Sequence, residues 1–256
     1  MATTRILCIG GSDSGGGAGI QADVKTVTLL GGYAMTAITA ITAQNSLEVA
    51  AIQCLPPDMV AAQLEACVAD IGVDAVKIGM LGNAAIARKV TAALQDLRGT
   101  HPDLPIIFDP VMIATSGAML TDDGAVAALD ALIALATLVT PNLPELAALG
   151  GEAALSVRCK ALLIKGGHGA GELLVDRLVG PGGEIARWEA SRITTRHTHG
   201  TGCTLASAIA CGLGQGMTLI DAIERARNFV RAALLAAPGL GQGAGPMGHH
   251  AVRDLC

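Results

Sequence analysis

Residues that could take part in catalysis are most concentrated at positions 197–203, which read His-Thr-His-Gly-Thr-Gly-Cys. An uncharged run of small residues follows at positions 204–211 and predicts a buried helix. The N–H groups that open such a helix have no partner inside it, and the helix dipole places partial positive charge there. Because Gly200, Thr201, Gly202 and Cys203 are small, an anion can approach these groups closely. The stretch predicts an anion hole suited to a phosphoryl group, although an ordinary glycine-rich loop before a buried helix would explain the same residues.

A second set of candidates consists of single residues that each follow a predicted buried strand. Ligands of open α/β sheets bind at the carboxyl ends of the strands, so these side chains should meet on one rim. Taken singly, each has a structural explanation as a turn amide, a cap or a solvated strand end. Their shared position favours a binding site. The residues are Gln44, Met80, Asp109, Asn142 and Lys165.

The types of these side chains indicate phosphoryl transfer. Asp109 and Glu145 offer hard oxygen donors of the kind that Mg²⁺ prefers. Lys165 can neutralise phosphate charge, and residues 200–203 can hold the negative charge that develops during transfer. Together these parts suit a kinase that uses Mg²⁺ and ATP, in which positioning and charge stabilisation supply most of the catalysis. The sequence contains no P-loop, no Gly-x-Ser-x-Gly and no His-Glu-x-x-His, and its first glycine-rich loop lacks the spacing of nicotinamide-binding proteins.

The elements that must position these residues alternate along the chain. We expect strands at residues 5–9, 35–42, 49–53, 74–78, 104–108, 137–139 and 161–164, and a hairpin of residues 173–179 with 185–190. We expect helices that begin near Ile20, Pro56, Asn83, Asp122 and Pro144, and a last helix at 219–235 before a glycine-rich surface loop at 239–250. This alternation predicts an α/β fold with a doubly wound, mostly parallel sheet and helices on both faces. No repeat or linker divides the chain, so we expect one domain of residues 1–256.

Composition excludes several classes of protein. The net charge is −5 and no dense Lys/Arg run occurs, so neither nucleic acid nor an anionic membrane is an expected partner. The seven cysteines include no Cys-x-x-Cys pair, and no signal peptide is recognisable, so we expect a reducing, cytoplasmic setting. Residues 26–47 and 201–220 lack charge, but their glycines and threonines indicate buried structure rather than membrane spans. The pair His249 and His250 is expected to lie inert on the surface.

Seven motifs, in order along nearly the whole chain, resemble those of the ribokinase-like kinases. Within that superfamily they are most similar to the hydroxymethylpyrimidine/phosphomethylpyrimidine kinases of thiamine biosynthesis. The number, order and spacing of the motifs are too specific for chance agreement. They are GGSDSGGGAGIQAD at 10–23, AITAQN at 40–45, KIGML at 77–81, FDPVM at 108–112, TPNLPE at 140–145, KGGH at 165–168 and THGTGC at 198–203.

This resemblance implies a reaction and a fold. The reaction is ATP-dependent phosphorylation of 4-amino-5-hydroxymethyl-2-methylpyrimidine, followed by a second transfer to its monophosphate that gives the diphosphate. The fold is the doubly wound sheet with a small lid of edge strands over the substrate, usually in a homodimer. Gln44, whose amide offers both a donor and an acceptor, would bind the aminopyrimidine edge, and Met80 would pack on the ring. Gly11 and Asp23 would complete the substrate site.

The resemblance also assigns the nucleotide side of the site. Asn142 and Glu145 match an Asn-x-x-Glu motif that organises Mg²⁺ and phosphates, and the residues that would hold the nucleotide are Asn142, Lys165, Thr198 and Gly200. The segment between Glu145 and Lys165 is shorter than the family usually has, which predicts a truncated helix after Glu145. The adenine pocket is expected between the helix after Cys203, the last helix and the loop at 239–248.

Cys203 departs from the wider superfamily. The sugar kinases that are similar to this chain have Gly-x-Gly-Asp here, and that Asp removes the hydroxyl proton. A thiol at a helix N-terminus can have a lowered pKa, so Cys203 is expected to act as a modest catalytic base, with a packing role as the alternative.

Two other functions are left open by the sequence. A pyridoxal or pyridoxine kinase would phosphorylate a hydroxymethyl group on a similar ring. A non-catalytic pyrimidine-binding protein could use the same fold, although it would need neither Lys165 nor the loop at 200–203, called the anion loop below.

Overall fold

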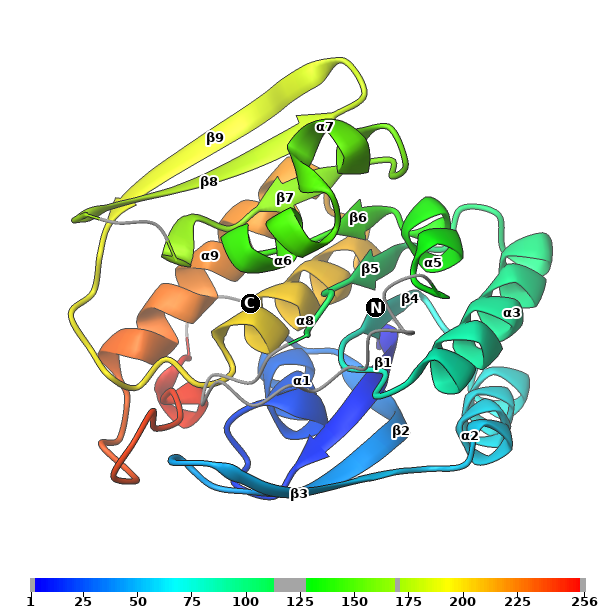
Figure 1. Ribbon diagram of the computed structural model, residues 1–256, viewed down its shortest axis with the longest axis horizontal. Helices are drawn as coiled ribbons and strands as arrows, with labels where there is room; N and C mark the ends of the chain where they lie inside the picture. Colours follow the sequence, from blue (N-terminus) through cyan, green and yellow to red (C-terminus); the bar gives the residue numbers. More distant parts are fainter. Residues whose placement is uncertain (1–2, 113–127, 169–170, 254–256) are drawn as a thin grey trace.

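The computed structural model describes residues 3–112, 128–168 and 171–253. In this part of the chain nine strands form one sheet, in the order β3-β2-β1-β4-β5-β6-β7-β8-β9 (Figure 1). Six of them run parallel, and they are β1 (Arg5–Asp13), β2 (Tyr33–Gln44), β4 (Ala75–Ile78), β5 (Ile106–Phe108), β6 (Leu138–Val139) and β7 (Leu162–Ile164). Strand β3 (Val49–Cys54) pairs antiparallel at one edge, and β8 (Leu173–Gly180) and β9 (Gly183–Ser191) form a hairpin at the other.

Helices cover both faces of this sheet. One face carries α1 (Gly19–Leu29), α8 (Thr201–Gly214) and α9 (Leu219–Leu235), and the other carries α2 (Pro57–Asp70), α3 (Ala84–Thr100), α5 (Asp130–Leu135), α6 (Leu143–Ala148) and α7 (Gly151–Ser156). Strand β1 shows why two cores form, because successive side chains of a strand point to opposite faces. Ile6 and Cys8 pack in one core, and Leu7 and Ile9 pack in the other. The predicted doubly wound α/β fold is confirmed.

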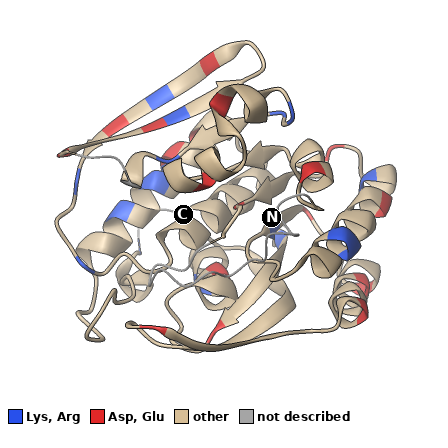
Figure 2. Ribbon diagram, in the orientation of Figure 1, with Lys and Arg blue, Asp and Glu red and all other residues tan. Residues whose placement is uncertain are grey.

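Helix α8 is the central helix of its face and contacts β1, β4, β5, α1 and α9. It carries no charged residue, whereas the hairpin β8–β9 carries charges of both signs (Figure 2). The helix begins at Thr201 because Gly200, its N-cap, has a φ of 87°, a left-handed conformation that favours glycine. This start places the N-terminus of α8 beside the carboxyl ends of the parallel strands.

The structure corrects one expectation from the sequence, does not cover a second and agrees with a third. The loop at 239–250 is not a surface loop throughout, because Met247 and His249 are each only 3% exposed. His249 opens the 3-10 turn η2 (His249–Ala251), contacts Thr204 of α8 and lies beside the ring of Phe229. The predicted helix start at Asp122 lies outside the described residues. The helix after Glu145 is short, as predicted, and ends at Ala148.

None of the helices in the described residues combines the length and the apolar character needed to span a bilayer.

Candidate active site

A cavity of about 780 Å³ runs along the carboxyl ends of the strands. The β1–α1 loop and the end of β2 line one end, and β8, β9 and α9 line the other. The structure brings all but one of the predicted site residues to this cavity. They are Gly11, Gln44, Met80, Asp109, Asn142, Glu145, Lys165, Thr198, Gly200, Thr201, Gly202 and Cys203.

The anion loop lies at the middle of the cavity. The first α-helical hydrogen bond of α8 runs from the N–H of Thr204 to the carbonyl of Gly200, at 2.9 Å. The N–H of Thr201 donates to the carbonyl of Thr198 at 3.3 Å. The N–H groups of Gly202 and Cys203 precede the first intrahelical bond and can donate to a ligand. A side chain at Gly200 would collide with the carbonyl oxygen of Gly17. Two features therefore require glycine at position 200: its positive φ and the close approach of the Gly17 carbonyl.

Lys165 and two carboxylates face the anion loop. Lys165 Nζ lies 2.7 Å from Asp109 Oδ1 and 4.0 Å from Glu145 Oε2. Burial alone would lower the pKa of Lys165, but the two carboxylates outweigh it and raise the pKa, so the side chain is a cation. A Cβ at Gly202 would lie 3.1 Å from Asp109 Oδ2 and 3.3 Å from Lys165 Nζ. The space between the loop, the lysine and the aspartate is therefore open only because residue 202 is glycine.

The start of α6 is built by Asn142 and Glu145 together. Asn142 Oδ1 accepts a hydrogen bond from the N–H of Glu145 at 2.9 Å, and Glu145 Oε2 accepts one from the N–H of Asn142 at 2.8 Å. This capping box orients the Glu145 carboxylate toward the cavity. Burial raises the pKa of Glu145 to about 7, and the charge of Asp109 acts in the same direction.

Asp23 is the predicted substrate contact that the structure does not bring to the cavity, and this corrects the expectation. Its carboxylate is fully buried, contacts Lys77 Nζ at 2.8 and 2.9 Å, and accepts a hydrogen bond from Ser207 at 2.6 Å. Helix α1 turns residue 23 inward onto β4, where Lys77 lines the cavity wall. Sequence reasoning missed Lys77, although a lysine inside a buried strand is a signal that a buried partner exists.

The thiol of Cys203 does not have the lowered pKa expected at a helix N-terminus. Burial raises the pKa of Cys203 to about 11, since the opposing effect of Lys77 is too small and the carboxylates of Asp23 and Asp109 also favour the neutral thiol. In this state Cys203 carries its proton at neutral pH.

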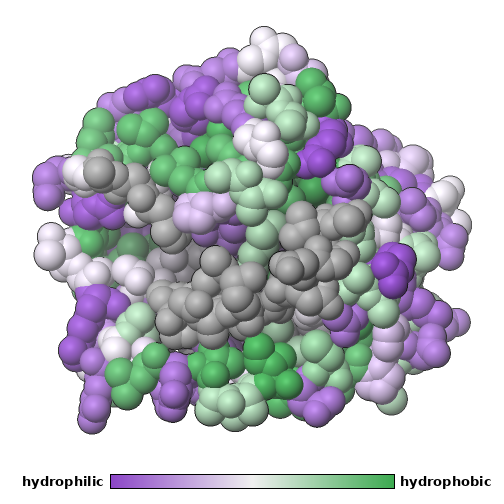
Figure 3. Space-filling view, in the orientation of Figure 1, coloured by the Kyte–Doolittle hydropathy of each residue, from purple (hydrophilic) through white to green (hydrophobic). Residues whose placement is uncertain are grey.

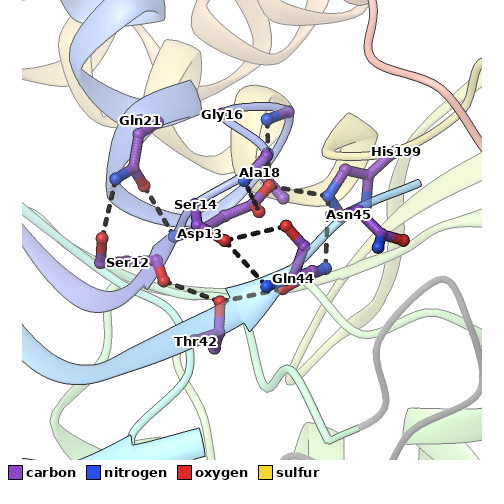
Figure 4. A network of polar contacts seen from close by, with 12 residues as sticks. Ser12, Asp13, Ser14, Gly16, Ala18, Gln21, Thr42, Gln44, Asn45 and His199 are labelled. Carbon is purple, nitrogen blue, oxygen red and sulfur yellow. Dashed lines mark hydrogen bonds and ion pairs between the residues drawn. The ribbon is translucent and has the colours of Figure 1, made fainter. Parts of the chain in front are cut away.

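Asp13 and His199 hold the end of the cavity at β2 (Figure 4). Both lie in motifs that the sequence singles out, but sequence reasoning gives neither side chain a role of its own. Asp13 accepts hydrogen bonds from the N–H groups of Gly15, Gly17 and Ala18 at 2.8 to 3.0 Å, and its Oδ2 lies 2.8 Å from His199 Nε2. Burial alone would raise the pKa of Asp13, but these hydrogen bonds outweigh it and lower the pKa. An acid inside a glycine-rich loop was the available signal.

At the far end of the cavity, Asp176 joins three elements. Its Oδ1 accepts a hydrogen bond from the N–H of Gly166 at 2.9 Å, and its Oδ2 pairs with Arg227 Nε of α9 at 2.7 Å. Apolar lining comes from Leu174 of β8 and from Val230 and Leu234 of α9, whereas residues 239–248 do not line the cavity. At this end of the cavity, the hairpin β8–β9 therefore lies where the loop at 239–248 was expected.

Comparison with known proteins decides the family. The family model described as phosphomethylpyrimidine kinase matches residues 13–248. The chain belongs to the phosphomethylpyrimidine kinase family. This chain is 44% identical over 264 residues to the hydroxymethylpyrimidine/phosphomethylpyrimidine kinase of Rhizobium meliloti. The matched region covers 96% of this chain and 97% of that protein. The predicted family, the kinase activity and the place in thiamine biosynthesis are confirmed.

This kinase is also similar to a longer, bifunctional protein and to a solved structure of a pyridoxal kinase. This chain is 46% identical over 258 residues to a thiamine biosynthesis bifunctional protein of Geobacter sulfurreducens. The matched region covers 95% of this chain and 52% of that protein. The chain thus spans about half the length of that relative. Among solved structures, an ADP complex of the pyridoxal kinase of Bacillus subtilis matches with a TM-score of 0.87 at 32% identity, covering 99% of this chain and 100% of that one.

The carboxylates of this kinase suit a magnesium ion that is shared with the nucleotide. In the described residues no three His, Cys, Asp or Glu side chains gather as a metal site. Mg²⁺ at kinase sites commonly takes only one or two carboxylates, with water and substrate phosphates as its other ligands. Asp109 Oδ2 is buried and has no hydrogen-bond partner among the described residues. Together with Glu145, this oxygen fits the donor set that Mg²⁺ requires.

Proposed function

We propose that this protein transfers the γ-phosphoryl group of ATP to the hydroxymethyl oxygen of 4-amino-5-hydroxymethyl-2-methylpyrimidine, and then a second phosphoryl group to the resulting monophosphate. One observation carries the proposal. A single cavity joins a ring-binding end at Gln44 and Met80 to a phosphoryl-binding centre at Lys165 and the N-terminus of α8. The names of the relatives, which include both the hydroxymethyl and the phosphomethyl substrate, support both transfers.

Charge stabilisation accounts for the chemistry that these residues can perform. The N–H groups of Gly202 and Cys203 and the Nζ of Lys165 donate to the phosphoryl oxygens as negative charge develops on them. Asp109 and Glu145 would hold Mg²⁺, which supplies charge neutralisation on the nucleotide phosphates when it is bound. Asn142 keeps Glu145 in position through the capping box. Phosphoryl transfer through a loose transition state needs little help from a base, so the hydroxymethyl proton can pass to an oxygen of the transferred phosphoryl group, and Cys203 need not be a thiolate.

At the other end of the cavity, Gly11 and Met80 shape the ring site. A Cβ at Gly11 would lie 3.0 Å from Met80 Sδ, so glycine at position 11 leaves the thioether free to pack on the face of a ring. Thr198 and Gly200, in the loop before α8, line the same cavity and would hold the nucleotide phosphates.

Product analysis tests the proposal. Purified protein is incubated with the pyrimidine, Mg²⁺ and ATP, and the mono- and diphosphate are separated by chromatography while ADP release is followed. We expect both products to form in sequence. Lys165→Met, which removes the cation at the phosphoryl centre, should lower kcat by about 100-fold or more. Binding of the pyrimidine without release of ADP would instead favour a non-catalytic binder.

A pyridoxal kinase is the second candidate, because the pyridoxal kinase of Bacillus subtilis matches this fold at a TM-score of 0.87. Pyridoxal also carries a hydroxymethyl group on a nitrogen heterocycle, so the same cavity can admit it. The discriminating measurement is kcat/KM for both ring substrates in one preparation. We expect the pyrimidine to be preferred, and turnover of pyridoxal alone would overturn the main proposal.

We also propose that the protein is a homodimer that uses the extension of β2 and β3. Ile41 is 51% exposed there, and Ala43 and Ala51, a directly paired couple on the same face, are exposed beside it. Figure 3 shows apolar surface along the lower edge, where β3 lies in Figure 1. Burying this face against a second copy would remove the exposed apolar area from water. Sedimentation should give a dimer, and Ile41→Glu should shift it toward monomer; a monomeric wild type would contradict this.

Two broader assignments complete the proposal. The unbroken nine-stranded sheet supports treating residues 1–256 as one domain. The six cysteines in the described residues are free thiols, which supports a reducing, cytoplasmic setting. Fractionation of cells followed by detection of the protein tests the second assignment.

A further inference from the structure

His199 is fixed from several sides at the ring-binding end of the cavity. Its side chain is almost fully buried, and its Nε2 lies 2.8 Å from Asp13 Oδ2. A Cβ at Gly17 would lie 2.5 Å from the Cδ2 atom of the imidazole, so the ring packs directly on the glycine backbone. The backbone of His199 also pairs with Pro246 in a β-bridge. The ring therefore has one position, and the neighbouring residue, Gly200, begins the anion loop.

The hydrogen-bonding partners of Asp13 determine where the proton of His199 lies. Asp13 already accepts three backbone N–H groups, an environment that keeps it an ionised acceptor. A carboxylate can only accept, so His199 Nε2 carries a hydrogen and donates it to Asp13.

The proton on His199 in turn determines the orientation of the Gln44 amide. Gln44 Nε2 lies 3.4 Å from His199 Nε2, and Gln44 Oε1 lies 3.2 Å from the hydroxyl of Thr42 (Figure 4). Two N–H donors cannot satisfy each other, and the Thr42 hydroxyl already donates to the carbonyl of Ser12 at 2.9 Å. A half-turn of the amide resolves both conflicts, because its oxygen then accepts the longer branch of the N–H that His199 shares with Asp13, and its nitrogen donates to Thr42.

This order matters for a heterocycle. After these two contacts the amide retains one N–H donor and one acceptor lone pair, with the acceptor on the His199 side and the donor on the Thr42 side. An aminopyrimidine presents an amino donor next to a ring-nitrogen acceptor, and it matches this pair in only one sense. The hydroxymethyl group lies on the other side of the amino group from that nitrogen. The order of the amide therefore determines to which side the hydroxymethyl group points.

We propose that His199 is a positioning residue, which fixes the order of donor and acceptor on Gln44 and thereby directs the hydroxymethyl group of an aminopyrimidine toward the anion loop. This inference rests on the proposed function, since it takes Gln44 as the residue that binds the ring.

A double-mutant cycle tests this role. Four proteins are compared: wild type, His199→Leu, Gln44→Ala and the double variant. We expect His199→Leu to lower kcat/KM for the pyrimidine by about tenfold, the value of one lost hydrogen bond to a charged or oriented group, and to leave KM for Mg-ATP unchanged. In the Gln44→Ala background the same substitution should have no further effect, because the amide through which it acts is gone.

Two further variants separate positioning from folding. His199→Gln places an amide N–H near the position of Nε2, so it should recover much of the lost kcat/KM. His249→Gln is the matched control, since His249 is a buried histidine that bonds Thr204 and does not line the cavity. It should lower Tm and leave KM for both substrates unchanged.

Independent effects of the two substitutions in the cycle would overturn the inference, as would an equal rise in KM for Mg-ATP. Failure of the proposed function appears differently, as a wild-type protein that does not phosphorylate the pyrimidine. The cycle is then measured as binding of the pyrimidine by isothermal titration calorimetry, and the same coupling criterion applies to the binding free energies.

Discussion

Lys77 Nζ contacts both carboxylate oxygens of Asp23, at 2.8 and 2.9 Å, in a pair whose side chains are at most 1% exposed. Burial alone would lower the pKa of Lys77, but the Asp23 carboxylate outweighs it and raises the pKa, so the lysine is charged. Ser207 adds a hydrogen bond from α8 to the same carboxylate. The pair thus joins α1, β4 and α8 behind the anion loop. Lys77 lines the cavity wall, whereas Asp23 supports the cavity from behind and does not line it.

Replacing Asp23 by Asn should therefore reduce stability more than it changes substrate binding. The substitution leaves the buried Lys77 without its counter-charge, and we expect a loss of about 3–5 kcal/mol in the free energy of unfolding, measured with urea. Asp58→Asn is the matched control, because its ion pair with Lys89 is exposed and should matter little. A higher KM for the ring at unchanged stability would restore Asp23 as a substrate contact.

Cys203→Ala tests whether the thiol acts as a base. General bases contribute about 10²–10⁴-fold to a rate, but a thiol whose burial raises its pKa to about 11 carries its proton at neutral pH. We expect kcat of Cys203→Ala to fall by no more than about tenfold, as for a lost hydrogen bond. Steady-state kinetics of the Ala, Ser and Asp variants provide the measurement. A loss of 100-fold or more in Ala that Asp reverses would contradict this and re-establish a base at position 203.

Gly202→Ala should abolish much of the activity without unfolding the protein. Its Cβ would occupy the space 3.1 Å from Asp109 Oδ2 and 3.3 Å from Lys165 Nζ, where a phosphoryl group must lie. We expect kcat to fall by about 100-fold, the loss typical of a disturbed oxyanion site, with Tm near that of the wild type. Gly99→Ala in α3, where a Cβ meets no atom within 4 Å, should keep full activity. Comparable losses in both variants would show that the effect is not local.

The stability of the protein should depend on His249 at acid pH. Burial lowers the pKa of His249 from 6.5 to about 4, so the folded state keeps it neutral while the unfolded chain protonates it near pH 6.5. Between about pH 6.5 and pH 4 the unfolded state binds more protons, so stability decreases as the pH falls, by about 3 kcal/mol in total. Urea unfolding at several pH values should show this slope in wild type and a shallower one in His249→Phe. Parallel slopes would rule out the assignment.

Local signals explain how much of the fold could be predicted from the sequence. Asn83 was expected to start a helix, and its side chain accepts a hydrogen bond from the N–H of Ile86 at 3.0 Å. Strand ends were also predictable, because a buried apolar run followed by a polar residue is visible within a few positions. Most of the rim of the cavity follows from this, since parallel strands bring their carboxyl ends together.

Pairings between distant residues explain what could not be predicted. Asp23 and Lys77 are 54 positions apart, and Asp13 and His199 are 186 apart. Nothing in the neighbourhood of either residue identifies its partner. The resemblance alone therefore places Asp23 at the substrate, and the glycine-rich pattern alone places Asp13 in a loop. The pKa of Cys203 could not be inferred either, because it depends on burial and on two carboxylates from other elements.

The turn after β2 is closed by the other end of the chain. Ser46 Oγ accepts hydrogen bonds from the N–H groups of Gln242 and Gly243, which lie 196 and 197 positions away. During synthesis, a growing chain presents residues 13–46 to the cell long before residues 199–246 exist to hold them. Contacts of such long range form late in folding. A ribosome must therefore have added residue 243 before the turn that borders this end of the cavity can be closed.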